Sequence, residues 1–217
     1  MQTLQPPLLP IVRLFWLMQS NEKFDRNGLS SLSLEAFRQH AQMVFQDPYG
    51  SFNPRLTVRD IIAEPLEAMQ LTQNRNETDL RVHEVATRCR LELENLRRFP
   101  HAFSGVQRQR ISIARALICR PSFIVADEAV AALDVKIQAE ILELIKELQK
   151  ELGLTILFIS HDLSVIANLC EQLLVMQHGK TVEQGPVEQI FLGPKDYTWN
   201  RISAIPTLEN LGEINAT

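Results

Sequence analysis

Glycine is scarce in this sequence. The 217 residues contain eight glycines, and the first of them is Gly28; an ordinary usage of roughly 7% would give about twice as many. A phosphate-binding loop of the form G-x-x-x-x-G-K-[S/T] needs glycines so that its backbone amides can wrap around phosphate, and no such loop precedes Gly28. The Gly-Lys-Thr run at Gly179–Thr181 has Leu174 where the first glycine of that loop belongs, so we expect a turn there.

Cysteines and long apolar runs are also few. Cys89, Cys119 and Cys170 stand far apart, with no C-x-x-C spacing. This pattern indicates reduced thiols of a cytosolic protein and no metal or redox role. The apolar stretch Leu8–Met18 contains Arg13 and is shorter than the ~20 residues of a membrane helix. No basic region precedes it and no cleavage site follows, so we expect no signal peptide, and membrane association only through a partner.

The charges give no sign of a nucleic-acid or membrane partner. The net charge is -4, and acidic and basic residues are interspersed along the chain. A nucleic-acid-binding domain would show a basic footprint, which is missing here. The content of 45% hydrophobic and 22% charged residues is typical of a globular protein. A chain of this length can form one substantial domain, or one core with a smaller subdomain.

The hydrophobic periodicity predicts alternating strands and helices after residue 103. A continuous apolar run, Phe123–Ala126, suits a strand buried on both faces. Asp134 can cap the following helix, which Gly153 ends. The other predicted elements are a short helix at Leu34–His40, a strand at Gln42–Phe45, a helical region at Thr57–Arg98, a helix at Val106–Ile118, a strand at Thr155–Ile159 and a hairpin of Leu173–Met176 with Thr181–Gln184. This order indicates an α/β domain with a parallel sheet and a helical subdomain.

Polar residues follow two of these strands. Asp127 and Glu128 come directly after one apolar run, and His161 follows the next. In open α/β sheets, functional groups gather at the carboxyl ends of the strands. Two adjacent carboxylates there suit phosphate chemistry, since one can hold Mg²⁺ and the other can orient water. Taken alone, Asp127 and Glu128 are as readily the start of a loop, and a lone histidine is more often structural.

Five motifs in one order resemble those of the ABC ATPases. The resemblance covers the chain from about Phe24 to Pro206. The motifs are Phe103–Arg110 with Ile113–Leu117 as the signature segment, Asp127-Glu128 as the Walker B end, Ala132-Leu133-Asp134 as the D-loop, Ser160-His161-Asp162 as the switch histidine, and Val44–Pro48 around Gln46 as the Q-loop. Each motif is weak alone, but together they are highly specific.

The resemblance implies an ATPase in which two nucleotide-binding domains enclose ATP. It implies that Glu128 and His161 are catalytic and that Asp127 and Gln46 hold Mg²⁺ through ATP. The residues implied to contact nucleotide are Gln46, Ser104, Gly105, Gln107 and Asp134. A helix N-terminus at Ser104-Gly105 suits anion binding, because its amides and dipole attract phosphate.

The resemblance also implies an incomplete P-loop NTPase-like fold in four parts. These are residues 1–56 up to the Q-loop, a helical subdomain at 57–103, the core at 104–192, and a tail at 193–217. Four further segments are similar to those of oligopeptide and dipeptide importers: Gln46–Tyr49, Asn53–Arg55, Tyr197-Thr198 and Ala204–Pro206. The implied partners are a second nucleotide-binding subunit and transmembrane permease subunits, which would hold the chain at the cytoplasmic face of the plasma membrane.

Three departures from the family pattern leave alternatives open. The phosphate loop is missing, Val106 replaces a signature glycine, and Ala129 replaces a common proline. The chain is therefore an importer subunit whose own ATP binding and hydrolysis are in question, a half-site partner that lends its signature segment to a complete subunit, or the non-functional truncated product of a broken or misannotated gene. The acidic net charge argues against a DNA-repair or translation ATPase.

Overall fold

The computed structural model describes residues 34–131 and 133–202 of the chain. The segments Leu8–Met18 and Ala204–Pro206, and Ala132 of the D-loop motif, lie outside the described residues. The chain divides into two compact units, residues 1–159 and 160–217, which are taken here one at a time. The α/β fold with a parallel sheet, predicted from the sequence, is confirmed.

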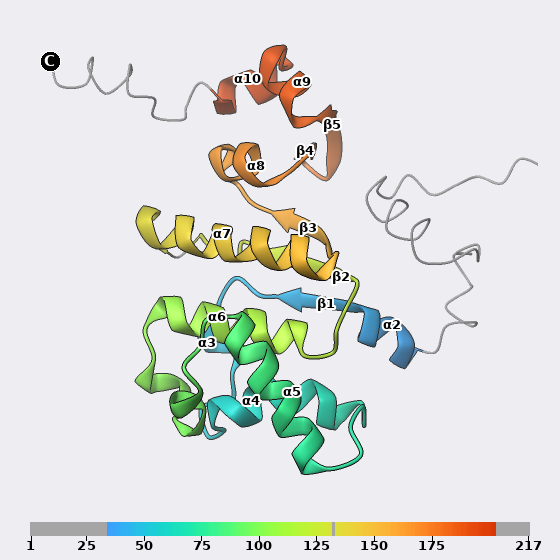
Figure 1. The fold of residues 1–217 in the computed structure, drawn as a ribbon. Coiled ribbons are helices and arrows are strands. Elements are labelled where there is room, and N and C mark those ends of the chain that lie inside the picture. Colours follow the sequence, from blue (N-terminus) through green and yellow to red (C-terminus); the bar gives the residue numbers. More distant parts are fainter. Residues whose placement is uncertain (1–33, 132, 203–217) are drawn as a thin grey trace, which may run out of the picture. The chain divides into compact units, whose positions relative to one another are not determined.

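A parallel sheet forms the centre of the first unit (Figure 1). Its strands are β1 (Ala41–Val44), β2 (Phe123–Asp127) and β3 (Thr155–Ile159), in the spatial order β1-β2-β3. The register pairs Val44 with Ala126 and Asp127 with Ile159. All three strands therefore end at the same edge of the sheet. The prediction for β1 was one residue late, and β2 extends one residue further than predicted, so that Asp127 still belongs to the strand.

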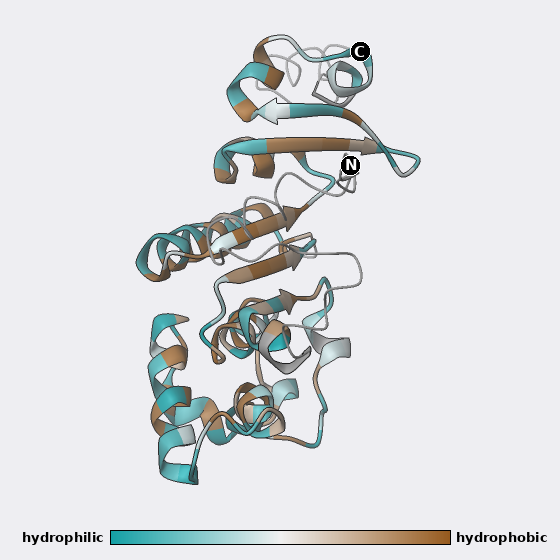
Figure 2. Ribbon diagram, turned by 90° about the vertical axis from the view of Figure 1, so that its right-hand side faces the viewer, coloured by the Kyte–Doolittle hydropathy of each residue, from teal (hydrophilic) through white to brown (hydrophobic). Residues whose placement is uncertain are grey.

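Helices make up the rest of this unit. Two of them, α6 and α7, pack against one face of the sheet, where strand residues Val44, Ile124 and Ala126 meet Ile113 of α6 and Ile145 of α7 around a small apolar cavity. Figure 2 shows the strands as mainly hydrophobic. The helices are α2 (Leu34–His40), α3 (Pro48–Ser51), α4 (Val58–Ala68), α5 (Arg75–Arg88), α6 (Gly105–Leu117) and α7 (Val135–Leu152), with 3-10 turns η1 (Leu93–Arg97) and η2 (Pro100–Ala102).

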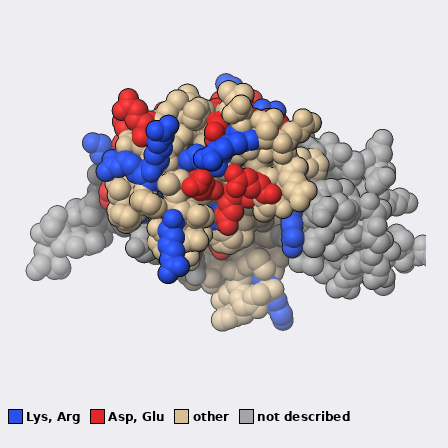
Figure 3. All heavy atoms as spheres, turned by 90° about the horizontal axis from the view of Figure 1, so that it is seen from below, with Lys and Arg blue, Asp and Glu red and all other residues tan. Residues whose placement is uncertain are grey.

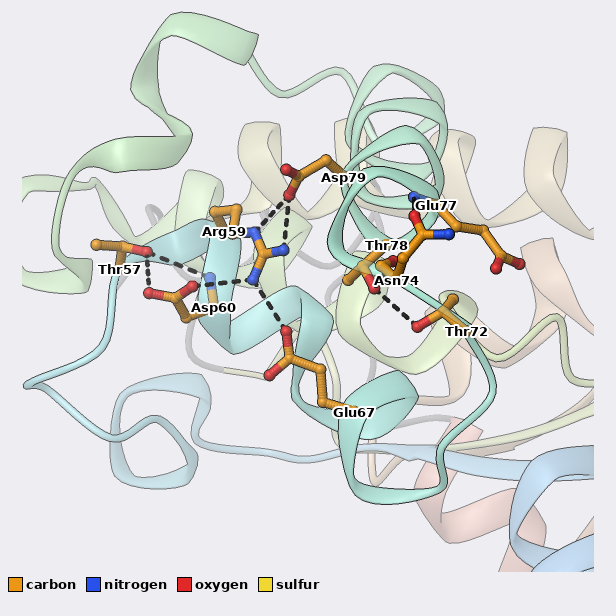
Figure 4. Close-up of polar contacts among 9 residues, drawn as sticks. All are labelled: Thr57, Arg59, Asp60, Glu67, Thr72, Asn74, Glu77, Thr78 and Asp79. Atoms are coloured by element: carbon orange, nitrogen blue, oxygen red, sulfur yellow. Dashed lines mark hydrogen bonds and ion pairs between the residues drawn. The ribbon is translucent and has the colours of Figure 1, made fainter.

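An ion-pair cluster ties α4 to α5 within the helical region (Figure 4). The guanidinium of Arg59, whose side chain is 14% exposed, donates to Asp79 at 2.7 Å and to Glu67 at 3.0 Å. It also donates to Asp60 at 3.1 Å. Partial burial opposes ionisation of Asp60, but hydrogen bonds from Thr57 and Arg59 outweigh it and lower the pKa of Asp60 below its ordinary value. One arginine thus pairs with three carboxylates at the junction of two helices.

The second unit contains the predicted hairpin. Its strands are β4 (Gln172–Gln177) and β5 (Lys180–Pro186), which are antiparallel. His178 and Gly179 join them with φ values of 49° and 75°, the positive-φ pair of a tight hairpin turn. Gly179 therefore lies in a turn, as predicted, whereas Lys180 and Thr181 begin β5. Within residues 160–202, the helices of this unit are α8 (Leu163–Leu169), α9 (Val187–Leu192) and α10 (Asp196–Ile202).

A buried polar contact holds α10 to the hairpin. The Thr198 side chain is fully buried, and its hydroxyl donates to the carboxylate of Glu183 at 2.5 Å. The backbone N–H of Lys195 donates to both oxygens of the same carboxylate at 3.2 Å. The Glu183 carboxylate thus accepts hydrogen bonds from a backbone donor and a side-chain donor at the start of α10. Because the hydroxyl of Thr198 has this partner, the residue can be buried.

Two further observations concern the surface. None of the helices within residues 34–131 and 133–202 combines the length and the apolar character needed to cross a membrane. Figure 3 shows basic and acidic side chains lying beside one another on one face of the molecule. This mixture matches the interspersed charges of the sequence.

Candidate functional site

The side chains of Gln46 and Glu128 meet just beyond the ends of β1 and β2. Val44 of β1 and Ala126 of β2 are register partners. Gln46 lies two residues after Val44, and Glu128 lies two residues after Ala126. The amide Nε2 of Gln46 donates to Oε2 of Glu128 at 2.6 Å. Hydrogen bonds to an ionised carboxylate are shorter and stronger than neutral ones. The register of two parallel strands therefore joins residues that are 82 positions apart in the sequence.

The backbone of Glu128 adopts a left-handed conformation, with φ of 45°. This conformation is uncommon for a residue other than glycine and is found most often where the surrounding structure enforces it. Here the N–H of Glu128 donates to the carbonyl of Ile159 at 2.9 Å, and its carbonyl accepts from Ala131 at 3.0 Å. The backbone leaves the strand sharply at Glu128, where the side chain makes its bond to Gln46.

Asp127 is the last residue of β2 and is half-buried. Its carboxylate and the side-chain carbonyl of Gln46 are hard oxygen donors of the kind that Mg²⁺ prefers. Within residues 34–131 and 133–202, no group of three or more His, Cys, Asp or Glu residues is placed to hold a metal ion. The donor set therefore fits a Mg²⁺ ion that brings most of its ligands with it as water and phosphate oxygens.

The signature segment begins α6 with a capping box. The hydroxyl of Ser104 accepts from the N–H of Gln107 at 3.4 Å, and the N–H of Ser104 donates to Oε1 of Gln107 at 3.0 Å. This arrangement satisfies two of the N–H groups that a helix start leaves without partners. The amide of Gln107, predicted to contact nucleotide, is used in the cap. Serine at 104 with glutamine three residues later was a readable sign of this motif.

Asp134 and Gly105 lie at neighbouring helix starts. Asp134 caps α7 as predicted, because its Oδ1 accepts from the N–H of Ile137 at 3.1 Å. A Cβ atom built on Gly105 would come no closer than 3.9 Å to its nearest neighbour, Cδ2 of Leu133. The start of α6 and the residue before Asp134 thus lie side by side.

A pocket of about 160 Å³ connects these segments. It lies between the Q-loop, the first turns of α6 and the loop after β2. Its lining residues are Gln46, Asp47, Pro48, Gly105, Arg108, Gln109, Ala129 and Leu133. The structure therefore brings together the predicted site residues Gln46, Glu128 and Gly105, with Ser104 and Asp134 next to the pocket lining.

His161 belongs to the second unit, so its position is given only within that unit. It is exposed and lies between Ser160 and Asp162 at the start of α8. Asp162 caps this helix by accepting from the N–H of Ser164 at 2.8 Å, and its own N–H donates to the hydroxyl of Ser160 at 3.0 Å. The histidine is thus carried on a short, well-capped turn.

The three thiols are poorly suited to chemistry. Burial raises the pKa of Cys89 to about 12 and the pKa of Cys119 to about 11. Burial also raises the pKa of the half-buried Cys170 to about 11. The thiolate is the reactive form of cysteine, so these residues behave as packing groups at neutral pH.

Three polar residues that line the pocket, Asp47, Arg108 and Gln109, were not among the predicted site residues. Gln109 lies on α6, is 2% exposed, and its Nε2 has no hydrogen-bond partner. Its spacing of four residues from Gly105 and Ile113 put it on a helical face, but a glutamine in a run of polar residues suggested exposure. Its burial depends on the packing of the Q-loop and the loop after β2, which sequence patterns do not reveal.

Comparison with known protein sequences connects this geometry to one family. Residues 11–131 match the family described as ABC transporter. The chain is 47% identical over 201 residues to the oligopeptide transport ATP-binding protein OppF of Bacillus subtilis (strain 168), covering 90% of this chain and 66% of that protein. It is 44% identical to the dipeptide transport ATP-binding protein DppF of Lactococcus lactis subsp. cremoris, covering 89% and 62%. The chain thus spans 62–66% of the length of these two relatives.

Solved structures show the same fold. The structure of cbiO1 from Clostridium perfringens, part of the ABC transporter complex cbiONQ, superposes with a TM-score of 0.67 at 26% identity, covering 90% of this chain and 72% of that one. The dimeric structure of the bacterial ABC transporter cassette MJ0796 superposes with a TM-score of 0.61 at 29% identity, covering 76% and 68%.

Proposed function

Because the chain belongs to the ABC transporter family, we propose that it acts as an ATP-binding subunit of a transporter that imports short peptides. The names of its relatives, oligopeptide and dipeptide transport ATP-binding proteins, support the substrate class. The observation that carries the proposal is the hydrogen bond between Gln46 and Glu128, since it links the loop after β1 to the carboxylate after the Walker B strand.

The proposed site residues fall into two groups with different roles. Asp127 and the carbonyl of Gln46 would hold a Mg²⁺ ion, which neutralises phosphate charge when it is bound with ATP. Glu128 orients the attacking water, and His161 contacts the terminal phosphate. Ser104, Gly105, Gln107 and Asp134 form the second group, which faces ATP held by a partner subunit. Within this group, the role of Gln107 is to form the capping box that fixes the start of α6.

The start of α6 has the physical properties of a phosphate site. The helix is 13 residues long and begins at Gly105, so its dipole and first N–H groups favour an anion there. Ser104 is exposed. A phosphate that approaches the helix start can therefore reach the Ser104 hydroxyl, which would then donate to phosphate in place of Oε1 of Gln107. Val106, where a second glycine is common in the family, narrows this approach with a branched side chain.

We infer that the signature side of this chain faces the phosphate loop of a partner subunit, whose amide cradle and lysine hold ATP. Ser104 and Gly105, at the start of α6, would complete that ATP pocket.

The partners follow from this arrangement. A second ATP-binding subunit supplies the phosphate loop, and transmembrane permease subunits carry the peptide. The complex would hold this chain at the cytoplasmic face of the plasma membrane. On the face shown in Figure 3, basic and acidic side chains are mixed, a pattern that does not favour direct adsorption to anionic lipid.

Peptide uptake tests the proposal in the native host. Deletion of the gene should abolish uptake of a labelled tripeptide, and the wild-type chain should restore it. The tagged chain should also bring down a permease subunit and a second ATP-binding subunit. Normal tripeptide uptake in the deletion strain, together with no co-purified membrane subunit, would refute the proposed function.

A further inference from the structure

Gln109 is a buried amide without a partner in the middle of the candidate site. The residue is 2% exposed, and its Nε2 makes no hydrogen bond. Ser112 and Ile113, three and four residues further along the same face of α6, are also buried. An apolar side chain at this position would avoid the cost of removing an amide from water. Buried polar groups in folded proteins nearly always have partners, so a buried donor without one calls for an explanation.

The pocket beside Gln109 contains a suitable acceptor. Gln46 and Gln109 both line it, one from the Q-loop and the other from α6. The bond from Gln46 to Glu128 uses Nε2 of Gln46. The carbonyl oxygen Oε1 of Gln46 has two lone pairs, so it can accept from a donor such as Gln109 and still contact Mg²⁺. A donor that needs an acceptor thus shares one pocket with an amide carbonyl.

The Q-loop and Gln109 border the same pocket of about 160 Å³. Gln46 is exposed, and a side-chain hydrogen bond of 2.6 Å joins it to Glu128. Beyond the Q-loop, the chain is anchored to α6, because Arg115 donates to the carbonyl of Ser51 at 3.0 Å. A contact between Gln46 and Gln109 would therefore need a movement of the Q-loop into this pocket, with Ser51 held in place.

We propose that Gln109 is a positioning residue that couples the Q-loop to the signature helix. When the Q-loop closes over the pocket, Nε2 of Gln109 donates to Oε1 of Gln46, while Nε2 of Gln46 keeps its bond to Glu128. The result is a continuous chain of hydrogen bonds from α6 through Gln46 to the end of β2, and such chains strengthen cooperatively. The start of α6, with Ser104, then follows the position of the Q-loop. This inference rests on the proposed function.

Three variants of the complex, purified through a tag on this chain, test the coupling. Gln109→Met keeps the length of the side chain but removes the donor. Gln46→Met removes the acceptor. Ser122→Ala is the matched control, because the Ser122 hydroxyl is also buried without a partner, but at the opposite end of β2. Each variant is assayed for melting temperature, for kcat and KM of ATP turnover, and for deuterium uptake of residues 44–51.

If Gln109 acts through Gln46, Gln109→Met should change kcat without lowering the melting temperature. Gln109→Met should leave the melting temperature unchanged or raise it, as should Ser122→Ala. Gln109→Met should lower kcat about fivefold or more without changing KM, a size typical of coupling between sites, whereas Ser122→Ala should not change kcat. In the Gln46→Met background, Gln109→Met should have no further effect, because the two residues act as a pair. Complex assembly should slow deuterium uptake at residues 44–51 in the wild type and much less in Gln109→Met.

Other results overturn the inference. A lower melting temperature for Gln109→Met would mean that the amide already has a partner in the resting state, such as a bound water. Equal losses of kcat in both backgrounds, or none in either, would show that Gln109 does not act through Gln46. If the wild-type complex shows no ATP turnover, the proposed function fails, and the deuterium uptake still decides whether Gln109 controls the Q-loop.

Discussion

The side chains of Gln46 and Glu128 lie 2.6 Å apart, amide nitrogen to carboxylate oxygen, because β1 and β2 run parallel and end in register. The substitution Gln46→Glu would place a second carboxylate against the first. Like charges at this distance repel by about 1 kcal/mol in a solvent-exposed setting, so the variant should be less stable than Gln46→Met at pH 8. Urea unfolding of both variants measures the difference.

The repulsion between the two carboxylates should depend on pH. Repulsion raises the folded-state pKa of one carboxyl of the introduced pair above its unfolded value. Relative to Gln46→Met, the Gln46→Glu variant should therefore be most stable below pH 4 and should lose stability as the pH rises through the folded pKa. A difference from Gln46→Met that stays constant between pH 4 and pH 8 would contradict the observed contact.

The Arg59 cluster makes a prediction for the helical region. The substitution Arg59→Met leaves Asp60, Glu67 and Asp79 close together without their cation, and should cost about 1–3 kcal/mol at pH 7. The lowered pKa of Asp60 means that its contribution is present at neutral pH and is lost as the pH falls through the folded pKa. The cost of Arg59→Met should therefore shrink in acid. The exposed Arg55→Met changes the same charge and serves as control; equal costs for both would count against the cluster.

Asp134 has a structural role that can be separated from its proposed contact with nucleotide. Its carboxylate caps α7, so Asp134→Ala should lower the free energy of unfolding by about 1 kcal/mol. Asp134→Asn keeps an oxygen for the N–H of Ile137 and should stay within a few tenths of a kcal/mol of the wild type. Thermal melts of both variants provide the measurement. If Asn is as damaging as Ala, the cap does not form as described.

The cysteines should be slow to react in the folded chain. A pKa of about 11 for Cys119 and Cys170 leaves roughly two-hundredfold less thiolate at pH 8 than a free cysteine would have, and a pKa of about 12 for Cys89 leaves roughly two-thousandfold less. Reaction with a thiol reagent at pH 8 should be slow without urea and fast in urea, and the half-buried Cys170 should react first. Rapid reaction of Cys89 in the folded chain would contradict its burial.

The elements that the sequence predicted best are those whose residues contain local signals. Phe123–Ala126 is continuously apolar, and Asp134 and Gly153 punctuate α7 at both ends, so these elements were predicted within a residue. The hairpin followed from His178-Gly179. The burial of Gln109 could not be predicted in this way, because it depends on packing between α6, the Q-loop and the loop after β2.

The site was predicted as a set of residues but not as a set of contacts. The motif order identified Gln46 and Glu128 separately, whereas their hydrogen bond requires the strand register. The double use of Gln107 in the cap and the left-handed backbone of Glu128 are likewise properties of local geometry. Sequence patterns identify which residues gather at a sheet edge; the register and the caps decide which atoms touch.

The central claim is that this chain lends its signature segment to a shared ATP site, and ATP turnover of the complex purified through a tag on this chain tests it most directly. The decisive comparison is between Ser104→Ala, Glu128→Gln and Asn74→Ala, the last of which removes the cap of α5 away from the site. The account predicts that Ser104→Ala lowers turnover about tenfold or more, since one oxyanion-type donor is typically worth that much or more. Glu128→Gln should also lower turnover, because Glu128 orients the attacking water, whereas Asn74→Ala should keep at least about half of it. Full activity of Ser104→Ala would contradict the account.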